Sequence, residues 1–154
     1  MMLDYFSGVR FGALMGAPEQ YYGVKPIGDL RLKAVFLDYP GDWVFFWSSQ
    51  GKTPLHNYMQ ELILDITYAR ETAYVVPRGV KARVPDVIIR GFYFEVETGL
   101  KKQKAALIRR LKNTNIFSYV VVPNLVVKAD YREFLPVFNG RLRTLLELKR
   151  EFAR

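Results

Sequence analysis

Residues 85–97 read Pro-Asp-Val-Ile-Ile-Arg-Gly-Phe-Tyr-Phe-Glu-Val-Glu, two β-like runs separated by a glycine. Side chains alternate between the two faces of a strand, so Glu95 and Glu97 are predicted to share one face, opposite the apolar residues beside them. Asp86 opens the first run. Carboxylates gathered on a pleated surface are the ligands that hard divalent cations prefer. Two other interpretations stay open: solvated acids on the open face of an edge strand, and an aspartate that caps a turn after proline.

The composition narrows the chemistry that such a site could perform. The chain has 154 residues, no cysteine and one histidine, His56. Disulfides, thiolate catalysis and cysteine-based zinc sites are therefore excluded, as is any mechanism that needs two histidines. His56 lies near the start of a predicted helix, where we expect it to be structural or exposed. Metal ligands would then be carboxylates and carbonyls, which favour Mg²⁺ or Mn²⁺.

Hydropathy predicts a cytoplasmic protein with no membrane partner. No apolar run approaches the roughly 20 residues that span a bilayer. The N-terminal residues lack the basic and apolar segments of a secretory signal. The composition is also compatible with an intracellular protein encoded by a virus or a mobile element.

The basic charge is concentrated in one part of the chain. Residues 1–100 carry 10 Lys and Arg and 11 Asp and Glu, whereas residues 101–154 carry 13 and 4. The two segments thus have net charges of −1 and +9, which sum to the net charge of +8 for the whole chain. Bases beside an acidic group suit phosphodiester chemistry, because bases hold the polyanion and acids hold a metal. The excess of basic residues in 101–154 could instead serve solubility alone.

Periodicity and capping signals predict an α/β (α+β) fold, with a central mixed sheet flanked by helices. Thr53-Pro54 is a typical helix start. Residues 1–31 are expected to be irregular with one short helix. The predicted strands are 32–38 and 43–48, which form a hairpin, and then 73–77, 80–84, 85–90, 92–97 and 117–123. The predicted helices are 54–70, 99–112 and a basic C-terminal helix within 126–154. That last helix is begun by a capping box of Asp130 and Glu133, broken near Asn139-Gly140 and continued from Arg141 to the end.

The order of these elements, with Pro85-Asp86 and Glu95-Val96-Glu97, resembles the PD-(D/E)xK nuclease superfamily. That superfamily includes restriction endonucleases, archaeal Holliday-junction resolvases and RecB-like nucleases. Its core is a helix, a three-stranded meander, a helix and a fourth strand, and the resemblance covers about 70 of the 154 residues. Asp86 and Glu95 match the two acids of the motif. We expect one domain, with an N-terminal part at 1–50, a nuclease-like core at 51–125 and the C-terminal helix at 126–154.

Glu97 departs from the family pattern, because the family has lysine at that position. Glu97 either enlarges the metal site while a lysine arrives from the following helix, or marks a nuclease fold that no longer cuts. Lys101, Lys102 and Lys104 lie close enough in the sequence to replace the lysine.

The resemblance implies a Mg²⁺- or Mn²⁺-dependent deoxyribonuclease that hydrolyses phosphodiester bonds with little sequence specificity. The implied catalytic residues are Asp86, Glu95, Glu97 and Lys102. The implied metal ligands are Asp86, Glu95, the carbonyl of Val96, Glu97 and Glu61. The implied DNA-binding residues are Lys101, Lys102, Lys104, Arg109, Arg110 and Lys112. The DNA could be duplex, single-stranded or branched, and many relatives are homodimers. Two alternatives remain: a non-catalytic DNA-binding protein on a degenerate nuclease fold, and a basic structural protein.

Overall fold

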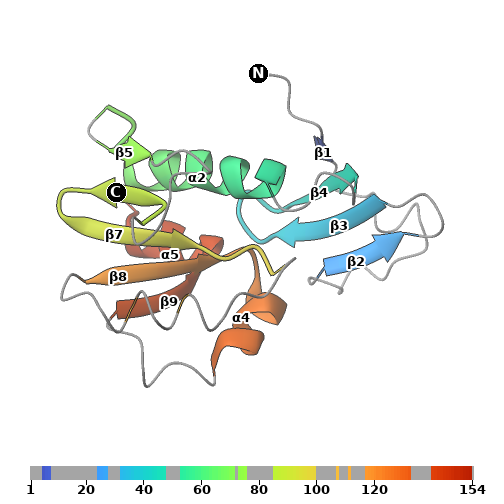
Figure 1. Ribbon diagram of the computed structural model, residues 1–154. Helices are drawn as coiled ribbons and strands as arrows, with labels where there is room; N and C mark the ends of the chain where they lie inside the picture. Colours follow the sequence, from blue (N-terminus) through green and yellow to red (C-terminus); the bar gives the residue numbers. More distant parts are fainter. Residues whose placement is uncertain are drawn as a thin grey trace.

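The protein has a mixed α/β fold with two sheets (Figure 1). The computed structural model describes residues 5–7, 24–27, 32–47, 53–71, 73–75, 85–99, 107, 111, 117–132 and 140–153. Within these residues, no helix has the length and apolar character that crossing a bilayer requires.

The first sheet is antiparallel and comes from the N-terminal part of the chain. Its strands are β1 (Tyr5–Ser7), β2 (Val24–Ile27), β3 (Leu32–Leu37) and β4 (Asp42–Trp47), in the order β1-β4-β3-β2. The predicted hairpin is confirmed as β3 and β4. The prediction of irregular structure for 1–31 is wrong at β1 and β2, because each pairs with one edge of that hairpin. The short helix expected there lies outside the described residues.

The second sheet has five strands and is mixed. Its elements are α2 (Thr53–Thr67), β5 (Tyr74–Val75), β6 (Val87–Ile89), β7 (Phe92–Val96), β8 (Ser118–Val122) and β9 (Gly140–Thr144), with strand order β5-β6-β7-β8-β9. Strands β5, β6 and β7 are antiparallel neighbours, whereas β8 runs parallel to both β7 and β9. Arg90 and Gly91, with φ of 50° and 84°, make the two-residue turn between β6 and β7. Positive φ at both positions is the requirement of a type I′ hairpin turn.

Two predicted elements lie wholly or mostly outside the described residues: the strand at 80–84 and the helix at 99–112. Of that helix, Leu107 and Leu111 are helical and buried, as the predicted apolar stripe requires. The predicted start at Gly99 is wrong, because Gly99 lies in a bend with a φ of 82°.

The C-terminal part differs from the prediction. Instead of a helix begun by Asp130, Asn124 caps α4 (Leu125–Tyr131), and Asp130 lies inside that helix. The predicted continuation of the helix from Arg141 is wrong over Gly140–Thr144, which is the strand β9, and is confirmed at α5 (Leu145–Glu151), which Thr144 begins with a capping box to Glu147. The segment Arg141-Leu142-Arg143 alternates polar and apolar residues, which is the period of a strand and not of a helix.

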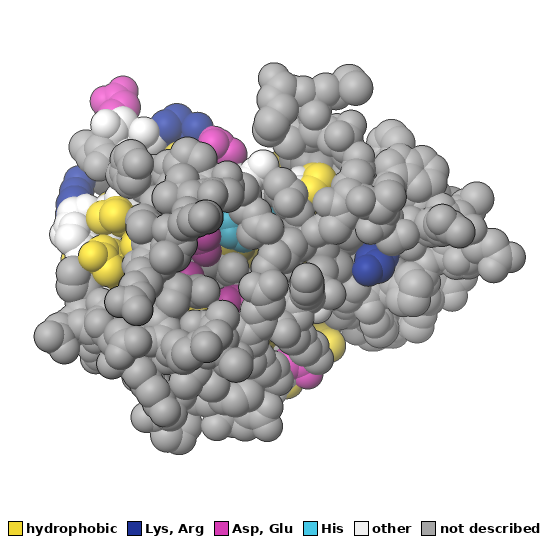
Figure 2. Space-filling view, in the orientation of Figure 1, with side chains coloured by type: hydrophobic (Ala, Val, Ile, Leu, Met, Phe, Trp, Pro, Cys, Tyr) yellow, Lys and Arg dark blue, Asp and Glu magenta, His cyan; other side chains and the backbone are white. Residues whose placement is uncertain are grey.

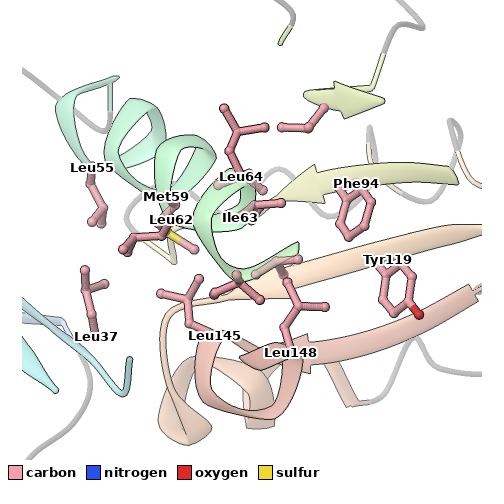
Figure 3. Packing of buried hydrophobic residues seen from close by; sticks show 14 of the residues in the cluster. Leu37, Leu55, Met59, Leu62, Ile63, Leu64, Phe94, Tyr119, Leu145 and Leu148 are labelled. Atoms are coloured by element: carbon pink, nitrogen blue, oxygen red, sulfur yellow. The ribbon is translucent and has the colours of Figure 1, made fainter. Parts of the chain in front are cut away.

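Hydrophobic residues pack on both faces of the five-stranded sheet. One cluster joins α2, α5 and the sheet, and Figure 3 shows Met59, Ile63, Leu145 and Leu148 turned toward one another beside Phe94 and Tyr119. The other cluster, on the opposite face, contains residues of α4, β8 and β9 together with Leu107 and Leu111. Leu37 of β3 belongs to the first cluster, so the N-terminal sheet shares this core.

Hydrogen bonds hold the N-terminal sheet against the carboxyl ends of β8 and β9. The Asn124 side chain donates to the Phe36 carbonyl over 2.6 Å, and the Asp38 amide donates to the Pro123 carbonyl over 3.0 Å. The Leu146 amide at the start of α5 donates to the Asp38 carboxylate over 2.9 Å. The β3–β4 turn is thereby placed beside the edge of the sheet where α4 and α5 begin.

Candidate functional site

Asp86 lies just before β6 and is held from two directions. The Val96 amide of β7 donates to its Oδ2 over 2.7 Å, and the Nε2 atom of His56 lies 3.0 Å from its Oδ1. Its own carbonyl accepts a hydrogen bond of 3.0 Å from the Gln60 side chain. Helix α2 and strand β7 thus fix both the backbone and the carboxylate of Asp86.

A structural role stays a prediction for His56, whereas the alternative prediction, that it is exposed, is wrong. It is 2% exposed, and its Nδ1 atom is buried without a hydrogen-bond partner in the part of the chain that the structure describes. His56 and Gln60 lie one turn apart on α2, so both side chains face Asp86. A signal was present in the sequence: two polar residues at i and i+4, next to the apolar stripe of this helix.

Glu95 lies beside Asp86 on the neighbouring strand. The register pairs Val87 with Phe94, and extending it by one residue puts Asp86 opposite Glu95. Directly opposed residues of antiparallel strands share a face of the sheet. Glu95 is 5% exposed and also pairs in register with Val120 of β8, so it is a buried acid in the interior of the sheet. The interpretation of Glu95 as a solvated acid on an edge strand is therefore wrong.

Glu97 is a second buried acid, also 5% exposed. Its amide donates to the Val121 carbonyl over 2.9 Å, which extends the pairing of β7 with β8 by one residue. Its Oε2 atom accepts a hydrogen bond of 3.2 Å from the hydroxyl of Tyr131 in α4. Burial raises the pKa of that hydroxyl well above its usual range, and the charge of Glu97 raises it further. Tyr131 therefore remains protonated and is the donor of this bond.

The structure brings together only some of the predicted site residues. Asp86, Glu95 and Glu97 gather at one end of β6 and β7, with Val96 between the two glutamates. Glu61, predicted as a metal ligand, lies instead on the exposed surface of α2, where its Oε2 atom is 2.6 Å from Arg70. The predicted bases lie outside the described residues: Lys101, Lys102, Lys104, Arg109, Arg110 and Lys112. Figure 2 shows acidic side chains and the histidine gathered near the middle of one face.

Comparison with protein-family models, curated proteins and solved structures found no match to this chain. The chemistry of the site must therefore be inferred from its own residues.

A divalent cation beside Asp86 would have to complete its coordination shell with water or substrate. Within the described ranges, no three His, Asp or Glu side chains are close enough together to hold a metal ion on their own. Mg²⁺ is commonly bound through one or two carboxylates, with water and substrate phosphate completing its shell. Carboxylate oxygens satisfy Mg²⁺ and Mn²⁺, and an imidazole nitrogen is a good donor for transition metals. Asp86, Glu95 and His56 supply both kinds of donor.

Proposed function

We propose that the protein is a Mg²⁺- or Mn²⁺-dependent deoxyribonuclease with little sequence specificity. One observation carries the proposal: the Asp86 carboxylate, 3.0 Å from the buried His56 and bound by the Val96 amide, lies at the end of β6 where the strand register puts it opposite the buried Glu95. Carboxylates at one end of a sheet are the donors that Mg²⁺ and Mn²⁺ prefer, which supports the proposal.

The order of elements supports the same proposal. Helix α2 is followed by the antiparallel strands β5, β6 and β7, by the helical residues Leu107 and Leu111, and then by β8, parallel to β7. The PD-(D/E)xK resemblance implies this order, with its acids at the start of the second strand and near the end of the third. Asp86 and Glu95 occupy those two positions.

The roles of the residues follow from their contacts. Asp86 and Glu95 would hold the ion, with water and substrate phosphate completing its shell, and the carbonyl of Val96 and the carboxylate of Glu97 are further candidate oxygen donors. A bound divalent cation supplies an activated water and offsets charge at the phosphate. The Val96 amide orients the Asp86 carboxylate toward His56. The bases of 101–112 would hold the DNA backbone, and contacts of that kind do not read sequence.

The test is a cleavage assay on linear duplex, branched and circular single-stranded DNA, with Mg²⁺, Mn²⁺ or EDTA. We expect cutting with either metal and none with EDTA. Glu95→Gln keeps the shape of the side chain and removes its charge, so it should slow cutting by at least about 100-fold, since even indirect loss of metal-site partners costs 10- to 100-fold.

Asp65→Asn is the matched control. Asp65 is an exposed acid on α2 that pairs with Arg70, away from Asp86. Its variant should cut like the wild type. Cutting by Glu95→Gln at the wild-type rate would show that Glu95 is not part of the site.

A second function, non-catalytic DNA binding, is favoured by one observation. The residue at the family's lysine position is an acid whose carboxylate is bound to a buried tyrosine. Protein that retards DNA in a gel, and leaves it uncut with both metals, would support this second function and contradict the first.

A further inference from the structure

Aromatic rings reach the surface at the first residue of β7, three positions before Glu95. Phe92 is 48% exposed, whereas Phe94, two residues further along the strand, is fully buried. The ring of Phe92 meets the ring of Phe117 edge to face, with 6.0 Å between the centroids and 87° between the planes. Phe117 in turn lies 5.2 Å from the ring of Tyr119 in β8. The exposed ring is therefore the outermost of a packed aromatic row, and this packing fixes its position.

Arginine side chains border the same row. The guanidinium group of Arg141 lies over the ring of Phe117, 5.4 Å from its centroid, and this arginine side chain is 51% exposed. Arg90, in the turn before β7, is also exposed. Arg141 and Arg143 share one carboxylate, that of Glu151, at 3.1 and 3.3 Å, so one acid faces two bases and leaves a positive excess. Figure 2 shows hydrophobic side chains at the surface beside a basic one, at the end of the molecule where Figure 1 draws the turn between β6 and β7.

The combination of rings and bases indicates what this surface binds. A single exposed apolar side chain would be ordinary on a protein surface. Exposed rings beside arginines are typical of sites for single-stranded nucleic acid, where bases stack on the rings and basic side chains hold the phosphates. A duplex keeps the faces of its bases inside its own stack, so only an unpaired base can stack on a protein ring. An apolar partner is disfavoured, because it would cover guanidinium groups without replacing their water.

We infer that the surface formed by Phe92, Phe117, Arg90 and Arg141 binds single-stranded DNA, with an unpaired base stacked on Phe92. The inference rests on the proposed function and narrows its substrate to DNA that has an unpaired segment. The two arginines contact backbone phosphates, so binding does not depend on the base sequence. The surface lies at the other end of β7 from the acids of the proposed site, so its variants leave those acids in place.

The test measures DNA binding by the full chain with EDTA present, so that metal-dependent cutting does not interfere. Fluorescence anisotropy follows the binding of a labelled single-stranded oligo(dT) and, in parallel, of a labelled duplex of the same length. Phe92→Leu keeps an apolar side chain against Phe117 and removes the flat ring. We expect loss of one stacked base to weaken binding of the single strand by about 5- to 150-fold and to leave the duplex affinity unchanged.

Two further variants separate stacking from the loss of apolar surface. Phe92→Tyr keeps a ring of the same shape and should bind the single strand like the wild type. Leu125→Ala removes another exposed apolar side chain, since Leu125 is 54% exposed on α4, over the opposite face of the sheet. This variant should also bind like the wild type. Circular dichroism melting shows whether each variant is folded at the assay temperature.

Arg141→Gln tests the phosphate contact. It should weaken binding of the single strand and reduce the slope of log affinity against log salt concentration by about 0.7, the value for one phosphate of a single strand. Arg70→Gln is the matched control, because the Arg70 side chain is also exposed and also bound to acids, Glu61 and Asp65. Its variant should keep the wild-type slope.

The outcomes distinguish this inference from the nuclease function. Wild-type affinity of Phe92→Leu for the single strand overturns the inference, even if the wild type cuts DNA. Equal weakening for single strand and duplex also overturns it, because loss of stacking affects only unpaired bases. A change in oligomeric state on sedimentation, with DNA affinity unchanged, would assign the surface to a second copy of the chain and overturn it too. A wild type that binds single strands as expected but never cuts with Mg²⁺ or Mn²⁺ refutes the nuclease function alone, and one that binds no DNA overturns both.

Discussion

Replacing Asn124 with alanine should destabilise the fold more than the loss of an ordinary helix cap. The Asn124 side chain makes two hydrogen bonds at once. Its oxygen accepts from the Val127 amide over 2.9 Å as the N-cap of α4, and its nitrogen donates to the Phe36 carbonyl over 2.6 Å. Loss of an N-cap costs about 1 kcal/mol. Loss of the hydrogen bond to the part-buried Phe36 carbonyl costs about 1 to 3 kcal/mol more. We therefore expect the free energy of unfolding to fall by about 2 to 4 kcal/mol.

Asn124→Ser separates the contributions of the two bonds. A serine hydroxyl caps a helix nearly as well as asparagine, but its side chain is shorter and supplies no amide donor for the Phe36 carbonyl. This variant should lose only about 1 to 3 kcal/mol. Urea unfolding followed by tryptophan fluorescence measures both changes. If Asn124→Ala lies within about 0.5 kcal/mol of the wild type, as surface substitutions usually do, the bond between the two sheets does not contribute to stability.

Three further predictions concern stability. Burial raises the pKa of the Asp38 carboxyl above 3.8. The contribution of Asp38 to stability is therefore largest below pH 3.8 and is lost as the pH rises through its pKa in the folded protein. Asp38→Asn should raise the melting temperature at pH 7, and this increase should disappear in acid. Burial raises the pKa of Glu147, but the hydrogen bonds from Lys128 and the Thr144 amide outweigh burial and leave it below 4.5. Lys128→Met should thus lower the free energy of unfolding at pH 7 by about 1 kcal/mol, and the deficit should shrink as the pH falls through the folded value, as urea titrations at several pH values would reveal. Gly91 and Gly99 have φ of 84° and 82°, but an added Cβ at Gly99 would stand 2.9 Å from Val127, whereas Gly91 faces open space. Replacement by alanine should lower the free energy of unfolding by about 1 to 2 kcal/mol at both positions, through backbone strain. At Gly99 the clash with Val127 should lower it by about 1 to 3 kcal/mol more. Equal losses of stability at the two positions would contradict this clash.

Much of the fold could be predicted because its elements carry local signals. Helix α2 has its Thr53-Pro54 start and a 3.6-residue period, and β8 is a short apolar run whose five residues are all buried. Strands β1 and β9 could not be found in this way. β1 pairs with β4, which is distant in the sequence, and β9 pairs with β8, which lies beyond α4; such pairing leaves only a weak local pattern.

The site was predicted to a similar extent. The spacing of Glu95 and Glu97 placed both acids on one face of a strand, and Asp86 was expected beside them. The sequence did not indicate that both glutamates would be buried, because burial depends on the packing of α4 over that face. It also did not identify His56 or Tyr131, whose contacts with Asp86 and Glu97 span 30 and 34 positions of the sequence.

The outer strands of the two sheets affect how the protein associates with itself. In the described residues, the five-stranded sheet ends on β9, which carries Arg141 and Arg143, and the four-stranded sheet ends on β2, which contains Pro26. Arginines along an edge repel a second copy, and proline has no N–H to offer to a neighbouring strand. Extension of either sheet from molecule to molecule is therefore disfavoured at these edges. Replacing both arginines with valine should therefore promote aggregation through β9.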